Sequence, residues 1–266
     1  MIEFRPPRGS LPGEWEPGPL LVDAGTLGLS YQSLPSGARL LQRVLSPDDC
    51  QRLVRAMKGS GQAQRVGVSG QSSGVGALGS WRATAWSPEL ARQLWLSVAQ
   101  SVPETRQMQD QTPTDWYALG TRRAHRRWQR VGLGPVLRFM RYDAGGSHLP
   151  HYDKGFDYPD SRRSLMSLVF YLTDSAPNAG GHTRLIEDGQ GAVPVWLRNH
   201  DDWPRPADAR QVLAWVRPRA GDAFLFDHRL CHDVELCRGF APRVVIRADV
   251  VFKALDRGTG VSCIGS

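Results

Sequence analysis

The stretch Ser147–Asp153, with the sequence SHLPHYD, contains a His-x-Asp pair formed by His151 and Asp153. It lies just after Val136–Tyr142, where the alternation of side chains predicts a β-strand. Residues two apart on an extended chain point to the same side, so this imidazole and this carboxylate can hold one metal ion. Because two ligands hold a divalent metal only loosely, the pattern requires a third ligand.

A third ligand is available far downstream in Phe224–His232, which contains two histidines, His228 and His232. Two histidines and one carboxylate on one face of an iron ion leave three coordination positions open. Such a centre suits a non-haem Fe(II) oxygenase, which binds a cosubstrate and O₂ together. An isolated His-x-Asp pair also occurs by chance, so the interpretation depends on the residues that follow it.

A series of motifs follows the His-x-Asp pair along the chain. They are an apolar strand at Leu165–Leu172, the segments Gly180–Leu185 and Arg219–Phe226, then His232, and Arg243 on a last strand. In this order the motifs resemble those of 2-oxoglutarate- and Fe(II)-dependent oxygenases of the prolyl 4-hydroxylase-like group. The resemblance covers about 136–252, which is under half of the chain.

The resemblance implies a metal site made of His151, Asp153 and His232. Related sequences use the histidine that follows a Phe-Asp-His-Arg motif, and they place it about as far before the cosubstrate-binding arginine as the eleven residues that separate His232 from Arg243. His228 is the alternative third ligand. His148 and His182 are expected to be pocket-wall or surface histidines.

The resemblance also implies a binding site for the distal carboxylate of 2-oxoglutarate. Arg243 is expected to take it, because a guanidinium can bind a carboxylate through two N–H groups. Arg247 is the alternative, since it shares a strand face with Arg243. Hydroxyl groups at positions matching Tyr142 and Thr183 often assist this carboxylate in the family.

The expected reaction is hydroxylation of an unactivated C–H group, with release of succinate and CO₂. Related halogenases have a small residue in place of the carboxylate that Asp153 supplies here. The resemblance implies Fe(II), 2-oxoglutarate and O₂, with ascorbate as an accessory. The substrate would be a small molecule, an amino acid or a peptidyl residue such as proline, because the fold alone does not name it.

Two alternatives use the same scaffold. The first is oxidative demethylation of nucleic acid, which the net charge of +7 favours weakly. Arg243 and Arg247 do not reproduce the wider arginine pair of that family, and no nucleic-acid recognition module is evident. The second is a non-catalytic metal-binding protein on a jelly-roll scaffold. The sequence does not indicate an oligomeric state.

Short strands separated by glycine and proline turns predict an all-β core with flanking helices, folded as a double-stranded β-helix, or jelly roll. One domain over 1–266 is expected, with a catalytic core at 136–252. Residues 1–130 would shape the substrate site, and their helices would brace one face of the barrel. Capping patterns predict helices that begin after Ser46 and Ser87.

The other predicted elements are short. Strands are expected at Leu20–Val22, Arg39–Val44, Trp81–Trp86, Ser164–Leu172, His182–Ile186, Val212–Val216, Ala223–Asp227 and Val244–Phe252, and a turn at Gly145–Gly146.

Three segments leave alternatives open. Gly61–Gly79 is rich in glycine and serine and is either a surface loop or a lid over the substrate. Arg122–Arg130 holds five arginines and is either a solvated surface segment or an anchor for an acidic partner. Arg82 lines the pocket mouth or faces solvent.

The remaining features of the sequence concern the state of the cysteines and the location of the protein. The four cysteines have no zinc-binding spacing, so free thiols are expected, and Cys231 should point away from a metal that His232 binds. The N-terminus lacks the apolar core of a signal peptide, and no apolar run is long enough to span a bilayer. The expected location is cytoplasmic, with no membrane partner.

Overall fold

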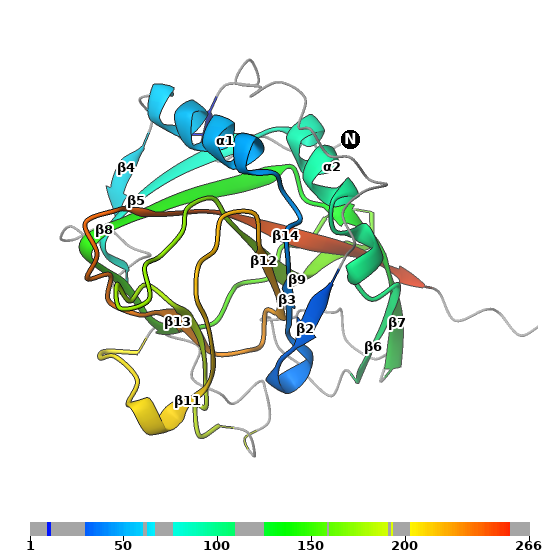
Figure 1. Cartoon of the computed structure of the whole chain (residues 1–266). Helices are drawn as coiled ribbons and strands as arrows, with labels where there is room; N and C mark the ends of the chain where they lie inside the picture. Colours follow the sequence, from blue (N-terminus) through cyan, green and yellow to red (C-terminus); the bar gives the residue numbers. More distant parts are fainter. Residues whose placement is uncertain are drawn as a thin grey trace, which may run out of the picture.

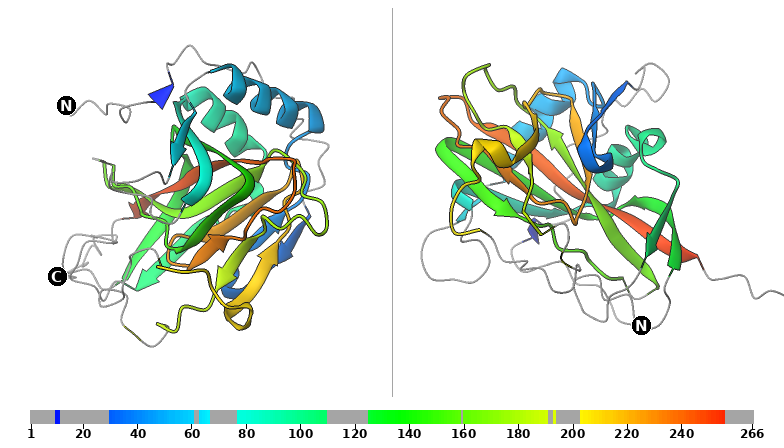
Figure 2. Two further views of the ribbon diagram at one scale, coloured as in Figure 1. Left: turned by 90° about the vertical axis from the view of Figure 1, so that its left-hand side faces the viewer. Right: turned by 90° about the horizontal axis from the view of Figure 1, so that it is seen from below.

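The computed structural model describes residues 10–11, 30–60, 63–66, 77–109, 125–158, 160–190, 193 and 203–255. The described chain is mostly β-structure, with antiparallel strands that curl into a jelly roll and two α-helices on one outer face (Figures 1 and 2). The expected fold class is therefore confirmed. Among the described residues, neither α-helix is long and apolar enough to cross a membrane.

The helices are α1 (Pro47–Gly59) and α2 (Pro88–Leu96). The strands are β1 (Ser10–Leu11), β2 (Tyr31–Ser33), β3 (Arg39–Leu41), β4 (Gln64–Val66), β5 (Ala77–Trp86), β6 (Thr105–Gln109), β7 (His125–Leu133), β8 (Val136–His151), β9 (Arg162–Tyr171), β10 (Thr183–Ile186), β11 (Val212–Val216), β12 (Ala223–Asp227), β13 (His232–Val234) and β14 (Arg243–Leu255).

Strand β8 joins the two halves of the jelly roll. The strand order is β11-β10-β13-β8-β14-β9-β12-β3-β2, with β5 also paired to β8 and β7 to β14. The first half of β8 pairs with β5 and β14, whereas its end at His151 pairs with β13. Strand β8 therefore carries side chains from the large sheet, which contains β5, β14 and β9, into the small sheet, which contains β13, β10 and β11.

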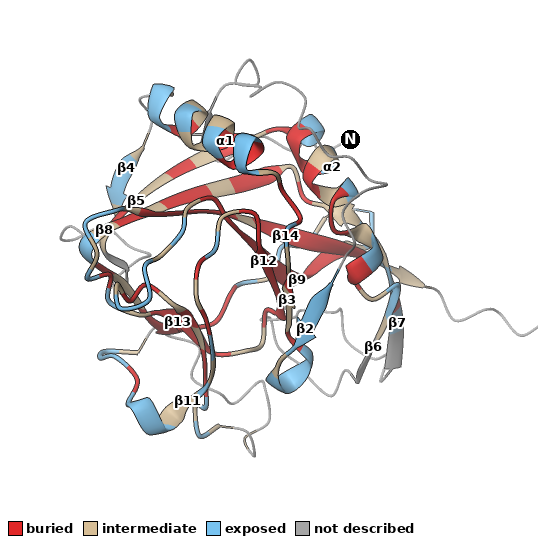
Figure 3. Cartoon of the chain, in the orientation of Figure 1, coloured by how far each residue is buried: buried red, intermediate tan, exposed pale blue. Residues whose placement is uncertain are grey.

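The two helices cover the outer face of the large sheet. Leu53 of α1 and Leu90 of α2 are fully buried in one cluster with Phe139 of β8 and Ile246 of β14. Figure 3 shows the buried side of both helices turned toward the strands. Because this face of the sheet packs on helices, the opposite face is left to line the interior of the barrel.

The predicted capping residues begin both helices. The hydroxyl of Ser46 accepts the backbone N–H of Asp49, and the hydroxyl of Ser87 accepts the backbone N–H of Leu90. A proline follows each serine in the first turn, where its missing N–H costs nothing.

The expected turn at Gly145–Gly146 is wrong. Strand β8 continues through both glycines, and Gly145 has a φ of 83°. Between Tyr142 and Ser147, β8 advances by five residues while β5 advances only from Ser80 to Leu78. A glycine pair marks a bulge as readily as a turn, because both need conformations that other residues avoid. The bulge lets β8 reach His151.

The arginine-rich segment is structured where it is described. Residues 125–133 form β7, which pairs with β6 and β14, and Trp128 is buried beneath the strand. The guanidinium of Arg130 donates to the backbone carbonyls of Ala99 and Val102. Arg130 therefore fixes the turn after α2, which is a structural role that neither alternative for this segment foresaw.

Several predicted features lie outside the described residues. They are the strand at Leu20–Val22, the residues 67–76 of the Gly61–Gly79 segment, the arginines at 122 and 123, and Cys263.

Replacing Phe139 by alanine should destabilise the protein by about 3–5 kcal/mol, since the ring is fully buried between the sheet and the helices. Phe240, whose side chain is fully exposed, is the matched control, and its replacement by alanine should change stability by about 0.5 kcal/mol or less. Urea unfolding followed by circular dichroism measures both values. Equal effects at the two positions would contradict the packing described above.

Candidate metal centre

The structure brings His151, Asp153 and His232 together at the end of β8. One potential ligand atom from each residue lies within 4.8 Å of the others. His151 and His232 are directly opposite in the antiparallel pairing of β8 with β13, and their ring centroids are 4.3 Å apart. Asp153 follows two residues after His151. The spacing in the sequence and the pairing of β8 with β13 together bring the three side chains to one place.

Each of the two histidines is held by a backbone carbonyl two residues before it. Nδ1 of His151 lies 2.7 Å from the carbonyl oxygen of Leu149, and Nδ1 of His232 lies 2.9 Å from that of Leu230. A carbonyl accepts but cannot donate, so Nδ1 carries the proton in both rings. The lone pair on Nε2 is then available for a metal ion.

The carboxylate of Asp153 is positioned by a chain of donors. Ser167 of β9 donates its hydroxyl hydrogen to Oδ2, and Nε of Arg247 lies 3.0 Å from the same oxygen. Nδ1 of His228 lies 3.1 Å from the Ser167 hydroxyl and donates to it, since that hydroxyl has already given its hydrogen to Asp153. His228 thus lies behind the carboxylate and outside the group of three.

Electrostatics favours the protonation states that metal binding needs. Burial alone would raise the pKa of Asp153, but Arg247 and the neighbouring histidines hold it below its usual range. Burial, followed by the nearby His151, lowers the pKa of His232 to about 3. An ionised carboxylate and a neutral imidazole are the forms that coordinate a metal ion.

Arg243 stands in the same cavity, near the start of β14. Its Nη2 donates to the Thr183 hydroxyl at 2.8 Å, and the Tyr171 hydroxyl donates to the same oxygen at 2.8 Å. The guanidinium carbon lies 4.9 Å from the ring centroid of Tyr142 and 5.6 Å from that of Tyr171. Nε and Nη1 of Arg243 are buried and have no hydrogen-bond partner in the described chain.

Two glycines before β10 pack closely against the segment that contains Leu236 and Cys237. Gly180 and Gly181 have positive φ values of 64° and 71°. A Cβ atom at Gly180 would lie 2.1 Å from the carbonyl oxygen of Leu236, and one at Gly181 would lie 3.4 Å from the Arg243 side chain. Side chains at these two positions would therefore disturb the chain that leads into β10 and Thr183.

The metal group and Arg243 line one cavity of about 280 Å³. Its walls between the two polar ends include Met140, Val169 and Val245. His148 also lines it, stacked on His151 with ring centroids 3.8 Å apart, and burial holds the pKa of His148 well below its usual value. Arg82 of β5 also lines this cavity, so of its two alternatives the structure shows the pocket-lining one.

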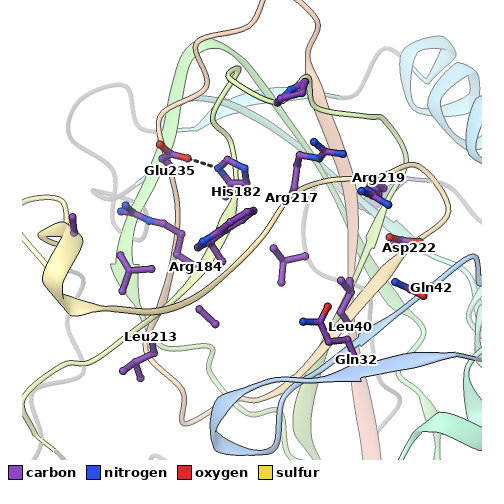
Figure 4. A pocket seen from close by; sticks show the side chains of 16 residues that line it. Gln32, Leu40, Gln42, His182, Arg184, Leu213, Arg217, Arg219, Asp222 and Glu235 are labelled. Atoms are coloured by element: carbon purple, nitrogen blue, oxygen red, sulfur yellow. Dashed lines mark hydrogen bonds and ion pairs between the residues drawn. The ribbon is translucent and has the colours of Figure 1, made fainter.

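A larger cavity of about 1050 Å³ lies on the outer side of β10 and β11 (Figure 4). His182 lies there with Nδ1 2.5 Å from a carboxylate oxygen of Glu235, which Figure 4 marks with a dashed line. None of the three grouped residues lines it. The smaller cavity, and not the larger one, therefore contains the possible metal ligands and Arg243.

Sequence reasoning overlooked several residues of the site. Ser167 and Tyr171 lie on an apolar strand that indicated core packing alone, and Asp249 lies inside the last strand. Strand alternation places Ser167 and Tyr171 on one face of β9, but it does not tell which face lines the cavity. Cys231 packs with Tyr152, Ile186 and Ala207 and does not line the cavity, in agreement with its expected orientation.

Residues 137–248 match a family model described as the 2OG-Fe(II) oxygenase superfamily. The matched segment is a 2OG-Fe(II) oxygenase domain. It runs from β8 into β14 and so contains His151, Asp153, His232 and Arg243. The chain is thus an enzyme of the dioxygenase type that uses Fe(II), 2-oxoglutarate and O₂.

Solved structures are similar to this chain at low sequence identity. OsALKBH1 has a TM-score of 0.52 at 16% identity, over 83% of this chain and 99% of that one. A prolyl-4-hydroxylase from Pseudomonas putida has a TM-score of 0.47 at 17% identity, over 80% and 91% of the two chains. No curated protein sequence matches this chain. The likeness to OsALKBH1 supports the jelly-roll fold and does not extend to the substrate.

Replacing Ser167 by alanine should weaken Fe(II) binding about 10- to 100-fold, because it removes a hydrogen bond that orients Asp153. Ser175, whose hydroxyl donates to the Gly180 carbonyl away from the metal group, is the control, and Ser175→Ala should bind Fe(II) as the wild type does. Anaerobic titration with calorimetry measures both affinities. Unchanged affinity in Ser167→Ala would show that the serine does not act through the carboxylate.

Proposed function

We propose that this oxygenase hydroxylates an unactivated C–H group of a small molecule, amino acid or peptidyl residue, using His151, Asp153 and His232 as its iron ligands. The observation that carries the proposal is the grouping of their ligand atoms within 4.8 Å, in one cavity with Arg243. The donor set fits iron, because two imidazoles and one carboxylate are the ligands that non-haem Fe(II) oxygenases use.

Arg243 is proposed to bind the distal carboxylate of 2-oxoglutarate. Its Nε and Nη1 are buried donors without a partner in the described chain, and a carboxylate is a strong acceptor for guanidinium N–H groups. Thr183 and Tyr171 orient the guanidinium, and the Tyr142 ring lies against it. Burial raises the pKa of both tyrosines to about 12, so their hydroxyls stay protonated and can donate.

Arg247, the alternative, is engaged elsewhere in the cavity. It pairs with Asp153 and, through Nη2 at 3.0 Å, with Asp249. It therefore supports the proposed metal ligand and is not the base that receives the cosubstrate. His228 plays a comparable supporting role through Ser167.

Iron with 2-oxoglutarate and O₂ supplies the oxidant for C–H hydroxylation, with succinate and CO₂ as the other products. The side chains of the chain itself position the reactants. The apolar wall of Met140, Val169 and Val245 suits the methylene groups of 2-oxoglutarate between its two polar ends. Within a single domain, residues 136–252 would supply this machinery and residues 1–130 would shape the substrate end through β5.

Replacing His232 by alanine should abolish stoichiometric Fe(II) binding, because a ligand of the group is lost. His228→Ala, four residues earlier in the turn before β13, is the matched control, and it should retain the metal with reduced affinity. Metal content after anaerobic reconstitution and succinate release from 2-oxoglutarate report the two functions. The opposite result, with iron lost only in His228→Ala, would reassign the third ligand to His228.

Replacing Arg243 by glutamine should weaken 2-oxoglutarate binding about 10- to 100-fold, since the charged partner of the distal carboxylate is removed. Fe(II) binding should persist, because Arg243 makes no contact with the metal group. Arg238, an exposed arginine that pairs with Glu235, is the control. The absorption band of the Fe(II)–2-oxoglutarate chelate, followed during anaerobic titration, measures the affinity. An unchanged affinity in Arg243→Gln would place the cosubstrate elsewhere.

A further inference from the structure

The cavity is lined by more positive than negative side chains. Five basic residues contribute to it, and Asp153 is the single acidic residue in the lining that the described chain supplies. The basic residues are Arg82, Arg138, Lys154, Arg243 and Arg247. An excess of charge on this scale in a partly enclosed space calls for negative partners.

Most of these cations have a partner. Arg247 pairs with Asp153 and Asp249, and Nη1 of Arg138 lies 2.9 Å from Asp249. Under the proposed function Arg243 receives the distal carboxylate of 2-oxoglutarate, and the proposal below rests on that assignment. Lys154 is exposed at the rim, where water solvates it.

Arg82 is the exception. It has no ion pair among the described residues, and its buried Nε has no hydrogen-bond partner there. Burial lowers the pKa of Arg82, and the charges of Arg138 and Arg247 act in the same direction. An anion that enters the cavity would therefore stabilise this half-buried guanidinium.

The strand register places Arg82 between the two functional ends. Arg82 of β5 is opposite Met140 of β8, which is opposite Val245 of β14, so the three form one row across the barrel interior. The row on one side pairs Tyr142 with Arg243, and the row on the other pairs Arg138 with Arg247. A group bound to Arg82 therefore lies beside both the cosubstrate end and the metal end.

We propose that the substrate is a small molecule with a carboxylate or phosphate group, and that Arg82 binds this group through its N–H donors. The volume of about 280 Å³ is at the lower end for ligand cavities, and 2-oxoglutarate occupies some of it, which favours a small substrate. The guanidinium suits both anions because each accepts two parallel N–H groups. Arg82 then acts as a specificity-determining residue, outside the iron and cosubstrate sites.

The test uses the protein loaded anaerobically with Fe(II) and 2-oxoglutarate. Matched pairs of ligands are titrated while the chelate absorption band is recorded: amino acids with their amides, and sugar phosphates with the parent sugars. The member of at least one pair that carries the carboxylate or phosphate is expected to perturb the band, and its counterpart without that anionic group is not. Which pair responds distinguishes a carboxylate from a phosphate.

Three variants assign the response to Arg82. Arg82→Met should bind the charged ligand at least about tenfold more weakly, whereas Arg82→Lys should retain some of the affinity. Arg141→Met is the matched control, because Arg141 pairs with Asp143 on the helix-facing side of the same sheet. Thermal melting of each variant confirms that it is folded.

The outcomes separate this proposal from the function on which it rests. Failure of the wild type to form the chelate band contradicts the proposed function itself. Given a normal band, three results overturn the proposed anion site: equal binding of ligands with and without the anionic group, no binding of any ligand that carries this group, or undiminished binding in Arg82→Met. A short acidic peptide is titrated in the same way, and a response confined to this peptide overturns the assignment to a small molecule.

Discussion

The pairing of His151 with His232 across β8 and β13 is the constraint on which the site depends. Opposite residues in an antiparallel pair point to the same face, so the register alone aims both imidazoles at one point. A shift by one residue would turn one ring to the other face of the sheet. The bulge at Gly145–Gly146 lies just before this pairing and absorbs the extra residues of β8 relative to β5.

Inside the barrel, the charged groups lie at two ends of the cavity, on different rows of paired strand residues. One end holds Asp153 among histidines and Arg247, and the other holds Arg243 against Thr183 and two tyrosine rings. Apolar side chains lie between the ends. Because an arginine buried in such a space is costly without an anion, each guanidinium indicates where negative charge belongs. By the same reasoning, Arg82 indicates a position for a further negative group, which belongs neither to the metal site nor to the cosubstrate.

Local features were predictable from the sequence, whereas features that depend on long-range register were not. The caps at Ser46 and Ser87 and the strands β11 and β12 follow from neighbouring residues, and the structure has them where they were expected. Ser167 and Tyr171 could not be assigned to the site, because an apolar strand does not reveal which strands face it. The glycine pair in β8 was misjudged because its local conformation serves a turn and a bulge alike.

The ion pair between Arg247 and Asp153 has a consequence for the apo protein. If a metal ion were the only positive charge near a buried carboxylate, folding would depend on that metal. Here a guanidinium already neutralises Asp153, and Ser167 satisfies the same oxygen. The polypeptide can therefore complete its fold before it acquires iron, and a chelator should strip the ion reversibly while the barrel stays intact.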